Sequence, residues 1–259
     1  VAFLVFDNGG IHVEVEKEIE FEIVSRPTPQ AVPDPDLRPK ANLDFNGLID
    51  RISQFPRDTS LAYQLGVRLV KAKNYERAEQ VLRDLLRREN CFEVLEALAI
   101  CVYHLGRWSE CAHFSRQALM LGEGFRDQRF ELLKFLGNSL IQLRDLDGAQ
   151  EAYEKAFLLF PGSDILQVNF GTLWIQRDDW HQATECFRHA LFLNDHSPTA
   201  WVGLALCHQV RGDLELAFAN VERALDEDPC NETAISLIMD WARDQKQFGS
   251  LRSCRSRPG

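Results

Sequence analysis

The pair Lys134 and Asn138, at the two ends of the stretch KFLGN, is the first feature of this sequence that could do chemistry. Residues four apart on a helix lie on the same face. An ammonium beside an amide on one face can hold a carboxylate or a peptide backbone. The same spacing also occurs in a repetitive helical scaffold, so the surrounding elements must decide between a binding site and structural filler.

Other chemistry is not indicated by the sequence. It contains no P-loop, no GxGxxG after a strand, no HExxH and no GxSxG. His181 and Glu185 lie one helical turn apart, as do Cys207 and Arg211, and such pairs are typical of surface contacts. We therefore expect no catalytic residue, no metal site and no cofactor, and we interpret the chain as a non-enzyme.

Composition indicates a cellular compartment and excludes some classes of partner. The seven cysteines include no CxxC pair, which argues against a disulfide framework or a zinc site. A reducing compartment, the cytoplasm, is the simplest interpretation. The net charge of −10 argues against nucleic-acid binding, which needs a basic face, and no apolar run approaches the length of a membrane span. The first residue is Val1 and not methionine, so we expect a trimmed or fragmentary chain.

Three zones differ in pattern along the chain. Residues 1–26 are expected to form strands, because DNGG is a strong hairpin turn between VAFLVF and IHVEV, and apolar and acidic residues alternate after it. A lone hairpin is marginal in water, so this segment must dock on the rest of the chain, on a missing domain or on a second copy. Residues 27–41 are rich in proline and predict an extended linker. Residues 246–259 form a basic tail.

From residue 42 to residue 245 the pattern is helical and repeats. Five gap-free copies open at Leu65, Leu98, Leu136, Phe170 and Leu204, with spacings of 33, 38, 34 and 34 residues. We assign the longer spacing to a glycine-bearing loop, LGEGFRDQ. A small residue follows each opening residue, and a large one begins the second half of each copy: Gly66, Ala99, Gly137, Gly171 and Ala205, then Tyr75, Trp108, Leu146, Trp180 and Leu214.

This period and this pattern of small and large positions resemble the tetratricopeptide repeat (TPR) family. The resemblance implies a mainly α fold, an α-solenoid of about five helix-turn-helix repeats with flanking helices, preceded here by the short β-hairpin. The repeats are expected at about 59–91, 92–129, 130–163, 164–197 and 198–231, followed by a capping helix at 232–245. A further helix is expected ahead of the first repeat, in LDFNGLIDRISQFP.

The family also implies a function. First helices of stacked repeats line a concave groove that commonly holds an extended peptide or a partner helix. The peptide- or partner-binding residues expected here are Lys134, Phe135, Asn138, Asn169, Gln142, Thr172, Tyr103 and His104. In one subclass of the family, a lysine, two asparagines and two further basic residues clamp a C-terminal carboxylate. Lys134, Asn138 and Asn169 match, but Thr199 and Gly203 replace the basic pair, so a carboxylate should bind more weakly.

Three hypotheses follow. The chain is a non-enzymatic scaffold or adaptor that binds a protein or peptide in the concave groove. Alternatively, it is the recognition or regulatory region of a larger enzyme or signalling protein, such as a glycosyltransferase. A third alternative is self-assembly into a homo-oligomer through residues 1–26. Phe135 could anchor a partner side chain or pack against a neighbouring helix, and the sequence leaves both interpretations open.

Overall fold

The computed structural model describes residues 2–7, 10–15, 45–55, 57–241 and 243. The chain divides into two units, Val1–Leu43 and Asp44–Gly259. In the first unit, strands β1 (Ala2–Asp7) and β2 (Gly10–Val15) pair antiparallel, with Ala2 opposite Val15. The expected turn at residues 8–9, the further strand residues to 26, the linker and the basic tail lie outside the described residues. What the N-terminal strands dock on stays a prediction.

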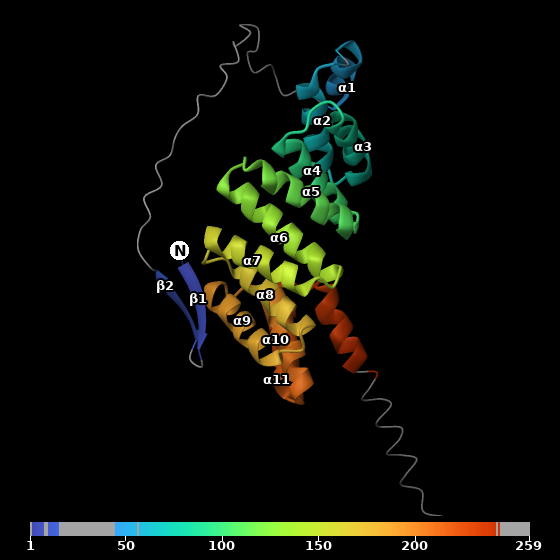
Figure 1. Ribbon diagram of the computed structural model, residues 1–259. Coiled ribbons are helices and arrows are strands. Elements are labelled where there is room, and N and C mark those ends of the chain that lie inside the picture. The colour runs from blue at the N-terminus through green and yellow to red at the C-terminus, as the bar shows by residue number, and fades with distance from the viewer. Residues whose placement is uncertain (1, 8–9, 16–44, 56, 242, 244–259) are drawn as a thin grey trace, which may run out of the picture. The chain divides into compact units, whose positions relative to one another are not determined.

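The second unit is a stack of helices, seen from α1 to α11 in Figure 1. Helix α1 precedes five helix pairs, and residues 232–241 form a further helix after them. The bounds are α1 Phe45–Gln54, α2 Thr59–Lys71, α3 Tyr75–Leu86, α4 Phe92–His104, α5 Trp108–Leu121, α6 Arg126–Gln142, α7 Leu146–Leu159, α8 Asp164–Gln176, α9 Trp180–Leu193, α10 Pro198–Arg211 and α11 Leu214–Glu227.

The turn inside each helix pair has the same backbone conformation. The eighth residue after each opening apolar residue has a positive φ: Lys73, Gly106, Arg144, Asp178 and Gly212. The next residue caps the second helix. Asn74, Asp145 and Asp179 do so by accepting a hydrogen bond from the backbone N–H three residues on. A left-handed residue followed by a cap fixes where one helix ends and where the next begins.

A small residue on the first helix lets a large residue of the second helix approach closely. A Cβ atom added at Gly171 would lie 2.6 Å from the ring of Phe187, and one added at Gly137 would overlap the ring of Tyr153. Gly203 of the next pair also abuts Phe187, so that one ring fills the space between two glycines. Tyr153 and Phe187 occupy the same place, seventeen residues after the opening residue of their copies.

The core is shared between neighbouring repeats. One buried cluster joins the first two helix pairs to Leu132 of α6. The last cluster joins α10 and α11 to Ala234 and Trp241 beyond them, and Trp241 contacts the Phe218 ring at 4.6 Å between centroids. Each repeat therefore depends on its neighbours for burial, as expected for a solenoid.

Helix α6 differs from the sequence prediction. Residues of LGEGFRDQ were expected in a loop, but Arg126 to Gln128 form the first turn of α6, so that part of the prediction was wrong. Arg126 donates a hydrogen bond to the carbonyl of Leu159, and its guanidinium lies 4.6 Å from the centroid of the Phe160 ring. These contacts hold the additional turn against the end of α7, and α6 reaches 17 residues.

First and second helices pack differently along the stack. Each first helix contacts the first helix of the next pair, from α2 with α4 to α8 with α10. Comparable packing between consecutive second helices, α3, α5, α7, α9 and α11, is not found among the described residues. The first helices therefore lie on the more closely packed, inner side, and the second helices spread apart on the outer side.

A buried carboxylate ties the first repeat to the second. Glu79 of α3 accepts hydrogen bonds from Arg83 on its own helix, at 2.7 Å, and from Arg107 at the start of α5. Glu110 of α5 completes the network with both arginines. Burial alone would raise the pKa of Glu79, but the hydrogen bonds from Arg83 and Arg107 outweigh burial and lower this pKa below its ordinary value of 4.5.

We expect Gly171→Ala to lower the melting temperature. Alanine gains about 1 kcal/mol of helix propensity, but overpacking against the Phe187 ring costs about 1–3 kcal/mol. The matched control is Gly162→Ala, where nothing lies within 4 Å of the added atom. Thermal unfolding followed by circular dichroism measures both. A Gly171→Ala protein as stable as the Gly162→Ala control would contradict the close approach.

The Glu79 network predicts a pH-dependent stability difference. Because the folded pKa is depressed, the carboxylate stabilises the fold above its ordinary pKa of 4.5, and this stabilisation is lost as pH falls through the folded pKa. The stability gap between the unaltered protein and Glu79→Gln should therefore shrink on acidification below about pH 4.5. Urea unfolding at several pH values measures it, with the exposed Asp84→Asn as control. A gap that stays constant with pH would count against the network.

Candidate functional site

The predicted binding residues all lie on first helices. Tyr103 and His104 end α4, Lys134 to Gln142 occupy α6, and Asn169 and Thr172 lie on α8. These helices line the inner side of the stack, and that the predicted side chains face this side stays a prediction. Tyr103 contacts both Phe135 and Asn138, whereas Gln142 and Thr172 are exposed.

Tyr103 is the centre of an aromatic cluster. Its ring lies 4.6 Å from that of Phe135, 5.4 Å from that of Trp108 and 5.6 Å from that of His104, measured between centroids. His104 in turn stacks on Tyr75 at 4.5 Å. Phe135 is half-buried and packs against the core of the first two repeats. Packing therefore accounts for most of the Phe135 side chain, and any contact with a partner would use only its exposed part.

The Asn138 amide bridges two tyrosines. Its Nδ2 donates to the Tyr103 hydroxyl at 3.0 Å, and its Oδ1 accepts from the Tyr153 hydroxyl at 2.6 Å. Tyr153 is fully buried, and burial raises its pKa, so the hydroxyl keeps its proton and donates. Asn138 thus links α4, α6 and α7 and has only part of its hydrogen-bonding capacity left for a ligand.

Lys134 is likewise engaged within the fold. Its Nζ lies 2.9 Å from Glu131 Oε1 and 5.2 Å from the centroid of the Phe130 ring, and its side chain is only 12% exposed. An ammonium already paired with a carboxylate has less attraction left for an incoming anion.

The surroundings of Lys134 are acidic. Glu96 of α4 is half-buried, and burial raises its pKa; the charges of Glu93 and Glu131 raise it further, against a hydrogen bond from Gln128 at 2.8 Å. Tyr63 of α2 also has a raised pKa, through burial and then through the charges of Glu96 and Glu93. Three acidic side chains of α4 and α6 therefore lie near one another, and we expect a negative potential around them.

Asn169 offers a donor that the fold does not use. Its Nδ2 atom is buried and has no hydrogen-bond partner among the described residues. Buried donors are nearly always paired in folded proteins, so this unpaired donor is unusual, and a rotation of the Asn169 side chain would bring it to a ligand carbonyl. The two positions of the expected clamp that lack a basic residue hold the exposed Thr199 and the buried Gly203, which abuts Phe187.

Family comparison agrees with this architecture. Models described as tetratricopeptide repeat match residues 63–110, 132–162 and 168–231, more than half of the chain. The chain belongs to the tetratricopeptide repeat family. The TPR array accounts for the paired helices, the small positions on first helices and the cores shared between neighbours.

Known proteins are similar to this TPR chain, one in sequence and others in fold. The cell division cycle protein 27 homolog of Caenorhabditis elegans is 26% identical over 176 residues, which are 68% of this chain but only 22% of that protein. The structure of YrrB, described as a TPR protein with an unusual peptide-binding site, matches 74% of this chain and 97% of its own at 16% identity and a TM-score of 0.55. The structure of the APC/C hetero-tetramer Cut9–Hcn1 matches 75% of this chain and 39% of its own chain, at 16% identity and a TM-score of 0.60.

The outer side of the TPR array carries a feature that sequence reasoning missed. A groove of about 600 Å³ lies between α5 and α7 with α6 as its floor. No sequence pattern signalled it, because its lining comes from three helices of two repeats that meet only in the folded chain. Among the described residues, no group of three or more histidine, cysteine or acidic side chains could hold a metal ion. No described helix combines the length and apolarity that crossing a membrane requires.

We expect Asn138→Ala to destabilise the protein by about 1–3 kcal/mol, because the buried Tyr153 hydroxyl loses its acceptor. Tyr153→Phe removes the hydroxyl itself and should cost less. In the double variant the two losses should not add, since they remove one interaction. Urea unfolding of the four proteins measures the coupling. Strictly additive losses would show that the bridge contributes nothing.

Proposed function

We propose that this chain is a non-enzymatic protein-interaction scaffold that holds an extended peptide or a helix of a partner on the inner side of its TPR array. The observation that carries the proposal is the buried, unpaired Nδ2 of Asn169, beside the exposed Thr172 one turn along the same helix. After a rotation of the Asn169 side chain, this donor can bond to a backbone carbonyl of a bound peptide. The likeness to YrrB, described as having a peptide-binding site, supports the same use of the fold.

The charges favour a particular peptide. Glu93, Glu96 and Glu131 lie on the inner side, and Lys134 is already paired with Glu131. A segment that carries lysine or arginine would gain from this potential, whereas a C-terminal carboxylate would be repelled. We therefore propose a basic segment as the ligand and not a clamped carboxylate. Asn138 and Tyr103 would support the shape of the surface, and Gln142 and Thr172 would meet the ligand.

A second candidate is that the array is the recognition region of a larger protein. The chain spans 22% of the length of the Caenorhabditis elegans relative that it matches. A TPR array inside a longer chain would bring a partner to the other domains of that chain. The binding side proposed above would serve the same purpose in both cases.

Arginine substitutions test the inner side. Thr172→Arg and Gln142→Arg place large cations at exposed positions on first helices, so they should block and repel a basic segment without disturbing the core. Glu185→Arg on the second helix α9 is the matched control. Affinity capture from the source organism is followed by quantitative mass spectrometry. The amount of each partner recovered should fall about tenfold, for the same partners, in both inner-side variants and should stay unchanged in the control.

Circular dichroism first confirms that the three proteins are folded. Equal recovery of every partner by the inner-side variants and the unaltered protein would overturn the proposal. Loss of the partners in the Glu185→Arg control alone would place the binding surface on the second helices instead.

A further inference from the structure

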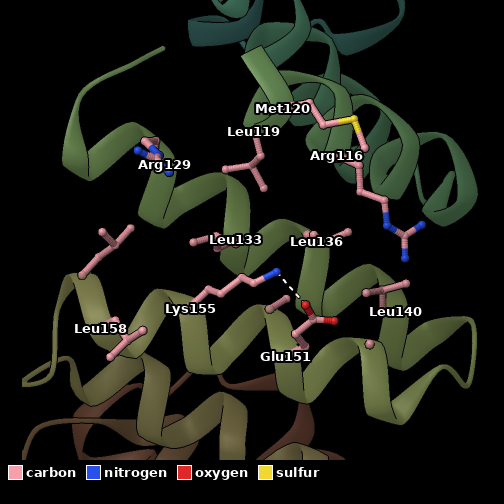
Figure 2. Close-up of a pocket in the computed structure, with 13 residues that line it drawn as sticks. Arg116, Leu119, Met120, Arg129, Leu133, Leu136, Leu140, Glu151, Lys155 and Leu158 are labelled. Atoms are coloured by element: carbon pink, nitrogen blue, oxygen red, sulfur yellow. Dashed lines mark hydrogen bonds and ion pairs between the residues drawn. The ribbon is translucent and has the colours of Figure 1, made fainter. Parts of the chain in front are cut away.

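The groove between α5 and α7 lies on the outer side of the array and is lined by three helices. Its floor is one stripe of α6, in which Arg129, Leu133, Leu136 and Leu140 follow one another at spacings of four, three and four residues. Figure 2 shows this stripe between Arg116 and Met120 on α5 and Lys155, Glu151 and Leu158 on α7. The volume of about 600 Å³ is in the range of ligand-binding clefts and far exceeds the space needed for a few waters.

The walls of the groove expose large apolar side chains in a fixed register. Met120 is 82% exposed and Leu158 is 62% exposed, and both stand twenty-two residues after the opening residue of their copies. Phe192 holds the same place on α9 and is 85% exposed. In the first and fifth copies this place holds Arg87 and Asp226. At this place, apolar side chains therefore occur only in the second, third and fourth copies, and those of the second and third line the groove. An exposed apolar patch marks an interaction site.

The charges of the groove are opposite to those of the whole chain. The chain has a net charge of −10, yet the lining includes Arg116, Arg129 and Lys155 against Glu151 alone. Lys155 and Glu151 neutralise each other at 2.6 Å. The Nε atom of Arg129 is buried without a hydrogen-bond partner among the described residues, and Arg116 reaches Asp145 only at 3.9 Å. Two guanidinium groups thus have donors left beside an apolar floor.

We propose that this groove binds an amphipathic helix of a partner protein, with apolar residues facing the floor and aspartate or glutamate meeting Arg116 and Arg129. A helix suits the site because side chains at spacings of three and four on α6 form ridges and grooves, and the ridges of another helix pack into such grooves. Acidic residues suit it because arginine forks pair carboxylates with two hydrogen bonds. This site is on the opposite side from the proposed peptide surface, so each can fail independently of the other.

A displayed library of amphipathic helices tests the proposal. The residues that flank the apolar face are randomised among acidic, basic and neutral types, and binders are selected on the unaltered full chain. The same library is counter-selected on Arg116→Glu/Arg129→Glu. We expect enrichment of aspartate and glutamate over lysine and arginine, and binding at least about tenfold weaker to the double variant. The loss should diminish at high salt, because salt screens the charge pairs.

Matched variants distinguish binding in the groove from a general effect of the protein's charge. Arg188 of α9 holds the place that Arg116 holds on α5, and it pairs with Glu185 outside the groove lining. Arg188→Glu should therefore leave binding unchanged. Leu158→Glu alters an exposed side chain and spares the core; it should abolish binding of the selected helices, while the equivalent Phe192→Glu should retain most of it.

Three outcomes would overturn the proposal. The first is failure to enrich any helix on the unaltered chain over the double variant. The second is enrichment of basic helices. The third is self-association of the unaltered chain in sedimentation velocity that Arg116→Glu/Arg129→Glu abolishes, because the occupant would then be a second copy of this chain.

Discussion

The close approach of the two helices in each repeat is the constraint on which the array depends. Glycine at the second position of a copy admits a large side chain seventeen residues after its opening residue: Gly66 admits Leu82, Gly137 admits Tyr153 and Gly171 admits Phe187. Where alanine replaces that glycine, at Ala99 and Ala205, the residue seventeen positions after the opening one is smaller, Ser115 or Val221. The two positions are thus matched in volume, as close-packed interiors require. The inner and outer sides exist because this contact holds the pairs in register.

The two sides differ in charge and in how they use their polar groups. The inner side carries the acidic Glu93, Glu96 and Glu131, and Lys134 beside them is paired with Glu131. On the outer side, Arg116 and Arg129 border an apolar floor. A chain with a negative net charge can therefore present one negatively and one positively charged surface. A scaffold of this kind could hold two unlike partners at once without competition between them.

The repeat register was readable from the sequence, because it rests on local periodicity and on small residues that recur at a fixed interval. It predicted the helix pairs, the first helices that bear Lys134 and Asn138, and the helix ahead of the first repeat. It did not predict what Asn138 contacts, because the two tyrosines that it bridges lie on other helices, α4 and α7, and meet it only when the helices are packed. Nor did it reveal the Glu79 network or the groove, which arise only when separate repeats are brought side by side.

The additional turn of α6 has a consequence for which changes of length this array tolerates. Four extra residues rotate a helix by only about 40° beyond a full turn, since a helix repeats every 3.6 residues. The leucines of α6 therefore keep facing their neighbours while the helix grows at its beginning. One or two residues inserted in the middle of a helix would instead rotate the side chains on one side of the insertion away from their neighbours. Insertions within helices of such a chain are thus restricted to nearly whole turns. The spacing of 38 residues, four more than 34, is such a change, and the longer repeat keeps its place in the stack.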